Sequence, residues 1–193
     1  MSRRASLNRV TKETAVQLEL RLDGGDTQID TPVGFLNHML ELFAHHSGFG
    51  LKINATGDTY IDDHHSVEDI GIVLGKALYE AAGDKLGIAR YGHCVLPMDE
   101  ALVEVALDFG GRAYLHCDLP FAASKCGSFD LQLIEEFFRA LASNAKMTLH
   151  IMKRHGANDH HVAEAAFKAV ARALKAALAI TSDALPSSKG VLE

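Results

Sequence analysis

The stretch DHHVAEAAFKAVARAL, residues 159–174, decides the fold because the chain contains it twice in related form. Placing His160 over His64 aligns it with DHHSVEDIGIVLGKAL, residues 63–78, so that an Asp, two His, a Glu and a final Ala-Leu coincide. In the second copy, apolar residues recur at helical spacing and form one stripe. The two copies therefore predict long helices over residues 65–83 and 161–180, with the paired histidines at their starts.

The flanking sequence repeats at nearly the same offset. Alternating apolar residues within 12–25 and 99–112 predict a strand in each half, and segments 26–32 and 113–120 predict a second. An amphipathic helix (33–46 and 128–145) and a short strand (50–56 and 147–154) precede each long helix. The order ββαβα, present twice, predicts an α+β fold with sheets packed against a helical layer. We expect one domain, 1–193, made of repeats at about 1–88 and 89–182 plus a C-terminal tail, 183–193.

Composition narrows the class of protein. A chain of 193 residues is long enough for one domain with a buried core. Its net charge of -6 and lack of a long basic run argue against nucleic-acid binding. No apolar run reaches membrane-spanning length, so no membrane contact is expected. The three cysteines form no CxxC pair, which favours a reducing, cytoplasmic location.

The repeated HHxxE motif has the composition of a metal site. Residues three and four apart share one face of a helix, so each glutamate can approach both histidines of its own copy. Adjacent histidines point about 100° apart around the axis, which suits two different ions. The candidate ligands are His64, His65, Glu68, His160, His161 and Glu164, joined by His38 on the first helix and its repeat equivalent, Glu136.

A single HHxxE is more often a solvated helix start, with Asp63 or Asp159 as the N-cap. Two copies at equivalent points of a duplication favour ligands instead. Imidazole and carboxylate without thiolate suit Mn, Fe, Co, Ni or Zn, and a six-coordinate site with open positions suits Mn(II). The zinc-protease order HExxH does not occur.

Five segments resemble imidazoleglycerol-phosphate dehydratases: GFLNHMLE (34–41), DDHHSVEDIG (62–71), RYG (90–92), the motif helix from residue 156, and LPSSKGVL (185–192). The resemblance covers about residues 3–192. It implies a fold similar to the second domain of ribosomal protein S5, with the helices between two sheets. It also implies a hydro-lyase of histidine biosynthesis that uses two Mn(II) ions per active site and converts D-erythro-imidazoleglycerol phosphate to imidazole acetol phosphate. Family members assemble from twenty-four subunits, with active sites at subunit interfaces.

Carried over by position, the resemblance assigns His38, His64, His65, Glu68, His160, His161 and Glu164 as metal ligands. At Glu136, either the carboxylate replaces a family histidine as ligand or one site loses a protein ligand. Position 136 holds His in some members, and position 42, often Gln, is Leu42 here. Glu13 in TKETA matches the general base. The substrate contacts would be Glu13, His64, His65, Glu68, Arg90, Arg112, His160, His161, Lys168, Ser187, Ser188 and Lys189, the cations and hydroxyls among them serving the phosphate.

Two other functions fit parts of the pattern. A protein that stores metal without catalysis would use the histidines but would need neither Arg90 nor Arg112 nor the SSK tail. A two-metal phosphoester hydrolase would be expected to contain more carboxylates and fewer imidazoles.

Overall fold

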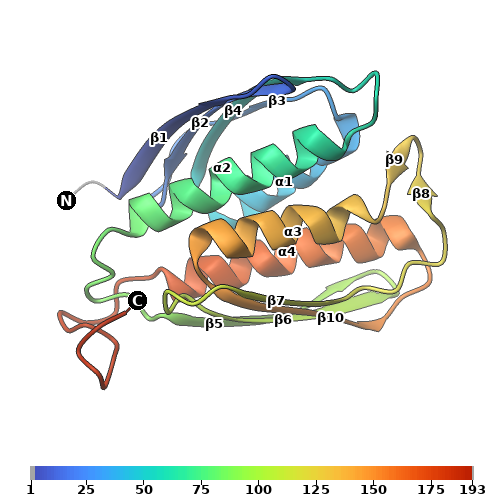
Figure 1. The fold of residues 1–193 in the computed structure, drawn as a ribbon. Coiled ribbons are helices and arrows are strands. Elements are labelled where there is room, and N and C mark those ends of the chain that lie inside the picture. Colours follow the sequence, from blue (N-terminus) through green and yellow to red (C-terminus); the bar gives the residue numbers. More distant parts are fainter. Residues whose placement is uncertain (1–2, 193) are drawn as a thin grey trace.

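The first half of the chain forms a four-stranded sheet with two helices on one face (Figure 1). The computed structural model describes residues 3–192. The sheet order is β1-β2-β4-β3, in which β3 and β4 are parallel and the other pairs antiparallel. The elements are β1 (Arg4–Val10), β2 (Thr14–Arg21), β3 (Thr27–Asp30), α1 (Gly34–Ser47), β4 (Gly50–Gly57) and α2 (His64–Ala82).

The second half repeats this topology. Its sheet order, β5-β6-β10-β7, places each strand where its repeat equivalent lies in the first sheet, again with one parallel pair, β7 and β10. The elements are β5 (Tyr91–Met98), β6 (Ala101–Asp108), β7 (Tyr114–Asp118), β8 (Lys125–Cys126), β9 (Phe129–Asp130), α3 (Leu133–Ala145), β10 (Thr148–His155) and α4 (Asp159–Ala177). The duplicated α+β fold with a helical layer between two sheets is thus confirmed.

Each half begins with one strand more than the predicted ββαβα order. The additional strands, β1 and β5, lie at sheet edges, where half of each strand faces solvent and apolar alternation is weak. β5 also contains Gly92 and Pro97, which depress strand propensity but are tolerated at an edge. A Cβ at position 92 would lie 2.0 Å from the carbonyl oxygen of Ala173, so only glycine allows β5 to approach α4 this closely.

The helix predicted over 128–145 begins later, at Leu133. Residues 125–130 form the short hairpin β8–β9 instead, which has no counterpart in the first half. The hairpin extends beyond the N-terminal end of α3 (Figure 1).

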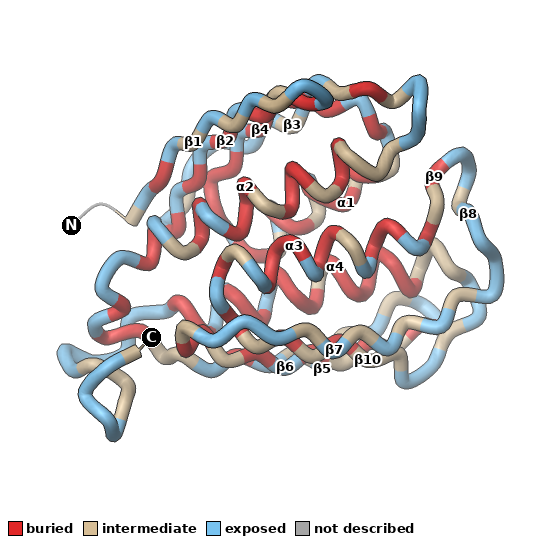
Figure 2. Tube along the Cα trace, in the orientation of Figure 1, coloured by how far each residue is buried: buried red, intermediate tan, exposed pale blue. Residues whose placement is uncertain are grey.

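The two halves share one core. Every second residue of β2 and of β6 is buried, which is the pattern of strands with one face against the helices. Figure 2 shows many buried residues along the helices and alternation of buried with more exposed residues along the strands. Helices pair across the halves: α2 packs on α3, and α1 packs on α4. Because the core cluster contains residues of both halves, we propose that 3–192 is a single domain. Residues 1, 2 and 193 of the expected domain lie outside the described residues.

The contact between α2 and α3 gives a stability prediction. A Cβ at Gly75 would lie 2.6 Å from the carbonyl oxygen of Leu141 and 2.8 Å from Cβ of Asn144. We therefore expect Gly75→Val to push the helices apart and to lower the free energy of unfolding by about 1–3 kcal/mol. Urea unfolding at fixed protein concentration measures this. Lys76→Val, on the exposed side of the same helix turn, is the control, and an equal loss in both variants would contradict the close contact.

Candidate metal centre

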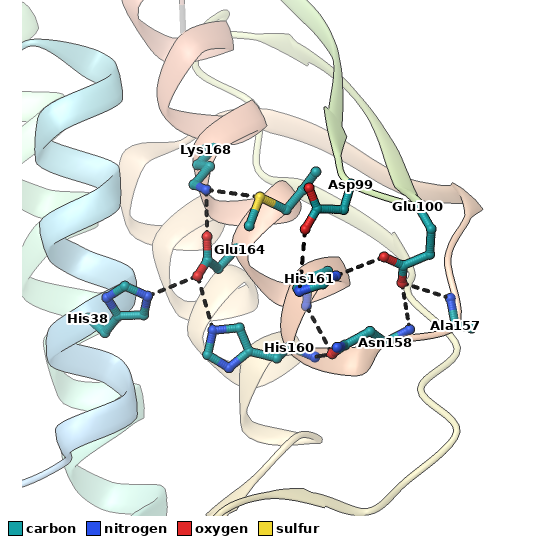
Figure 3. Close-up of polar contacts among 10 residues, drawn as sticks. His38, Asp99, Glu100, Ala157, Asn158, His160, His161, Glu164 and Lys168 are labelled. Atoms are coloured by element: carbon teal, nitrogen blue, oxygen red, sulfur yellow. Dashed lines mark hydrogen bonds and ion pairs between the residues drawn. The ribbon is translucent and has the colours of Figure 1, made fainter.

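Three candidate ligands from different halves meet where α1 packs on α4. Nε2 of His38, on α1, and Nε2 of His160, on α4, each lie 3.0 Å from Oε1 of Glu164 (Figure 3). One ligand atom from each of the three residues lies within 4.8 Å of the others. Among residues 3–192, this is the one group of at least three such side chains that close. Cross-half packing of the helices creates it, because α1 brings His38 to the first turns of α4.

The carboxylate of Glu164 is ionised at neutral pH. Burial raises its pKa, but the Lys168 ammonium donates to Oε2, and His38 and His160 bond to the other oxygen. These bonds outweigh the burial and hold the pKa at about 2. Two imidazole nitrogens and one carboxylate oxygen therefore converge as an anionic donor set, which fits a divalent ion such as Mn(II), Fe(II) or Zn(II).

The predicted N-cap position is found at α2 but not at α4. The side chain of Asn158 accepts from the backbone N–H of His160 and of His161, at 3.0 and 3.4 Å. Asp159 instead accepts from the backbone N–H groups of Ala122 and Ala123. The prediction of Asp159 as the N-cap is thus wrong by one residue, because the N-cap residue, which has an extended backbone conformation, is Asn158.

In the first half, the hydrogen bond to the start of the helix comes from the residue before the N-cap. Asp62, rather than Asp63, accepts from the backbone N–H of His64, at 2.8 Å. Asp63 is the N-cap residue of α2, as predicted, but its side chain makes no cap hydrogen bond.

The second histidine of each pair points away from the first. The interplanar angle is 85° in both pairs, with ring centroids 6.3 and 6.4 Å apart. Nδ1 of His161 lies 2.7 Å from Oε2 of Glu100, and Nδ1 of His65 lies 3.1 Å from Oδ2 of Asp58. The predicted pairing of Glu164 with both of its histidines therefore holds for His160 alone.

The repeat-equivalent set, Glu136, His64 and Glu68, forms no such close group among residues 3–192. His64 lines a cavity of about 360 Å³ together with Lys125 and Gln132, beside the β8–β9 hairpin. The carboxylate of Glu136 lies 3.4 Å from the guanidinium of Arg139 in its own helix. Within 3–192, no hydrogen bond or ion pair joins Glu136 to His64 or Glu68.

Five of the six cations and hydroxyls expected to hold phosphate line another cavity, of about 250 Å³, which we call the tail cavity. They are Arg90, Arg112, Ser187, Ser188 and Lys189. Arg90 holds the C-terminal tail in place, because its guanidinium donates to the carbonyl oxygen of Pro186, at 2.9 Å. The same guanidinium donates to both carboxylate oxygens of Asp108, at 2.7 and 3.0 Å. The sixth, Lys168, lies beside the cluster of His38, His160 and Glu164 and donates a hydrogen bond to Glu164.

The remaining predicted residues lie apart from both groups. Glu13 is exposed, with Oε2 3.9 Å from Nδ1 of His65. Leu42 packs against the core. Sequence reasoning missed Asp58 and gave Glu100 no role. A signal existed for Glu100, because it aligns with Glu13 in the repeat.

Fold and site together define a duplicated α+β protein with a cluster of histidine and glutamate side chains that could hold a metal ion. A profile of the family described as imidazoleglycerol-phosphate dehydratase matches residues 31–174. The enzyme of that name from Granulibacter bethesdensis is 54% identical over all of both chains, and the one from Caldicellulosiruptor saccharolyticus is 53% identical over 99% of each. The chain belongs to the imidazoleglycerol-phosphate dehydratase family, and it is a hydro-lyase of histidine biosynthesis.

Solved structures agree with this assignment. The imidazoleglycerol-phosphate dehydratase from Staphylococcus aureus has 46% identity and a TM-score of 0.85, over 92% of this chain and 99% of that one. The structure from Pyrococcus furiosus has 39% identity and a TM-score of 0.85, over 96% and 100%. No helix within the described residues is long and apolar enough to span a membrane.

Proposed function

We propose that the chain dehydrates D-erythro-imidazoleglycerol phosphate to imidazole acetol phosphate with Mn(II), two ions per active site. The observation that carries this proposal is the cluster of His38, His160 and Glu164, whose ligand atoms lie within 4.8 Å of one another. We assign one ion to this cluster. The further ligands would be His64, His65, Glu68, Glu136 and His161.

The reaction breaks a C–O bond beside the imidazole ring and a C–H bond on the next carbon, and the resulting enol rearranges to the ketone. When bound, the metal supplies Lewis acidity toward the ring nitrogens, which lowers the ring pKa and favours departure of the hydroxyl group. Glu13 takes the weakly acidic carbon proton. Its side chain is 55% exposed and therefore accessible to a substrate that binds beside His65.

The tail cavity would hold the phosphate. Arg112 and the Ser187–Lys189 segment offer N–H and O–H donors, while Arg90 anchors the tail through Pro186. A metal-storage protein has no need of such an anion site, and this favours the dehydratase over that alternative. The imidazole-rich donor set likewise disfavours a two-metal phosphoester hydrolase. Lys168 neutralises Glu164 within its own chain.

The geometry supports an active site shared between chains. The backbone N–H of Arg90 donates to the carbonyl oxygen of Ala177, at the C-terminal end of α4, whereas His160 lies in its first turn. At 1.5 Å per residue, the metal cluster and the tail cavity are roughly 25 Å apart along α4. One small substrate cannot reach both. We therefore propose that a neighbouring subunit supplies the tail cavity, within a homo-oligomer that the family resemblance puts at twenty-four chains.

The proposed compartment is the cytoplasm. Cys94, Cys117 and Cys126 are all free in the structure, which suits a reducing environment.

Turnover of imidazoleglycerol phosphate by chelated protein tests the proposed function. We expect no imidazole acetol phosphate without metal and formation of this product after Mn(II) is added. Metal-independent turnover would contradict the proposal, as would metal binding without turnover, which is the outcome expected of a storage protein. Hydrolysis to free phosphate would identify the phosphoester hydrolase.

The role of the tail cavity gives a second prediction. Arg112→Ala removes a charge-assisted hydrogen bond to phosphate, so we expect KM to rise about 10- to 100-fold. Steady-state kinetics measures this, with Arg4→Ala as a control on the exposed edge strand. Unchanged KM in Arg112→Ala would exclude this cavity from phosphate binding.

A further inference from the structure

The second histidine of each motif has its Nδ1 bonded to a carboxylate. Nδ1 of His161 bonds to Oε2 of Glu100, at 2.7 Å, and Nδ1 of His65 to both oxygens of Asp58, at 3.2 and 3.1 Å. A carboxylate oxygen accepts hydrogen bonds, so this geometry favours a proton on Nδ1 of both rings. In the neutral imidazole, the lone pair of Nε2 is then free for a metal ion.

The two carboxylates come from different places in the repeat. Glu100 immediately precedes β6, as Glu13 precedes the equivalent strand β2. Asp58 immediately follows β4, whereas the equivalent strand β10 is followed by Gly156, which has no side chain. In the second half, Glu100 bonds to Nδ1 of His161, and Asp99 lies 3.8 Å from Nε2 of the same ring. In the first half, Asp58 bonds to Nδ1 of His65, and Glu13 lies 3.9 Å from that nitrogen.

Both carboxylate oxygens of Glu100 make hydrogen bonds. Its Oε1 accepts from the backbone N–H of Asn158, at 2.8 Å, and of Ala157, at 3.3 Å, while Oε2 faces His161 (Figure 3). Oε1 therefore accepts from two backbone N–H groups, and Oε2 remains as the acceptor that faces Nδ1 of His161. Glu13 has a different setting: its carboxylate is 3.9 Å from His65, whose Nδ1 is already bonded to Asp58.

We propose that Asp58 and Glu100 are positioning residues that fix the Nδ1–H tautomer of His65 and His161 and so present Nε2 to metal. Asp58 accepts from Nδ1 of the histidine in the first half, as Glu100 does in the second half. Glu13, the repeat equivalent of Glu100, therefore does not have to orient His65 and can serve another purpose. This last step rests on the proposed function, in which Glu13 is the base, whereas the tautomer assignment does not.

Glu100→Gln tests the assignment sharply because of the two backbone donors. The amide oxygen of Gln is expected to face the N–H groups of Ala157 and Asn158, as Oε1 does now. Its NH₂ group then faces His161 and donates to Nδ1, so the proton moves to Nε2. Orienting carboxylates of this kind contribute about 10- to 100-fold to metal affinity, and we expect a loss of that size for Mn(II).

The measurement is the ¹⁵N solid-state NMR spectrum of full-length, histidine-labelled protein without metal, at about pH 8.5, where neutral imidazole predominates. Signals of His161 are assigned with a His161→Gln sample. We expect Nδ1–H in the unsubstituted protein and Nε2–H in Glu100→Gln, with lower Mn(II) affinity by calorimetry. A retained Nδ1–H in the variant overturns the proposal, and so does a switched tautomer with undiminished Mn(II) affinity.

Two further variants complete the test. Glu104→Gln replaces a nearby β6 glutamate that pairs with Arg154, and it should leave the His161 spectrum unchanged. If Glu100→Gln does not fold, Glu100→Ala removes the acceptor and should populate both tautomers, whereas Nδ1–H alone would overturn the proposal. Because the spectra need neither metal nor substrate, a chain that fails to dehydrate imidazoleglycerol phosphate still gives a decisive tautomer result.

Discussion

Glu13→Gln is expected to lower kcat by about 10²- to 10⁴-fold, the usual contribution of a general base. The substitution keeps the size and hydrogen-bonding capacity of the side chain but removes the basic carboxylate. Glu13 lies beside His65 without holding its Nδ1, since Asp58 does so at 3.1 Å. The variant should therefore bind as much Mn(II) as the unsubstituted protein.

Steady-state kinetics and metal analysis of the same samples check this expectation. Glu41→Gln, an exposed glutamate on α1, is the matched control and should retain full turnover. If Glu13→Gln turned over at a comparable rate, another group would have to take the carbon proton. If it lost metal along with activity, Glu13 would belong to the metal site instead.

Glu164→Ala is expected to abolish turnover by a different route, the loss of metal. Glu164 is 7% exposed, and its carboxylate bonds to His38, His160 and Lys168. Its removal takes away the anionic donor and leaves the Lys168 ammonium without its partner beside the two imidazoles. An ammonium group at the centre of the cluster repels a divalent ion, so we expect metal content to fall at this site.

Metal analysis after dialysis against a weak chelator measures the loss, and kinetics with added Mn(II) tests whether excess metal restores activity. Glu80→Ala, an exposed glutamate on α2, serves as the control. A Glu164→Ala protein with full metal content and ordinary turnover would show that this cluster is not the metal centre.

The double variant His65→Ala/His161→Ala should lose metal as well, as Glu164→Ala is expected to do.

The duplication made the fold predictable. Two aligned HHxxE helices and two aligned strand patterns were sufficient for the layered α+β arrangement. The edge strands β1 and β5 escaped prediction because their outer faces are solvated and β5 contains Gly92 and Pro97. The β8–β9 hairpin escaped because two-residue strands leave no periodic pattern.

The sequence predicted which residue types form the candidate site, but it predicted only some of the contacts between them. Helical spacing allowed Glu164 to meet either histidine of its own motif, and the structure selects His160. Its other partner, His38, comes from the opposite half through the packing of α1 on α4, which local sequence does not encode. Asp58 was missed for a similar reason, since its role depends on where the loop after β4 meets the start of α2.

Subunit complementation tests the central claim, dehydration at a site to which two chains contribute. One inactive variant, Glu164→Ala, lacks a metal ligand, and a second, Arg112→Ala/Lys189→Ala, lacks the phosphate donors of the tail cavity. The two proteins are dissociated by chelation, mixed, and reassembled with Mn(II), and formation of imidazole acetol phosphate is measured. We expect the mixture to be active although neither parent is, because an intact metal cluster on one chain then meets an intact tail cavity on another. A mixture of verified hybrid oligomers that is no more active than its parents would contradict the shared site.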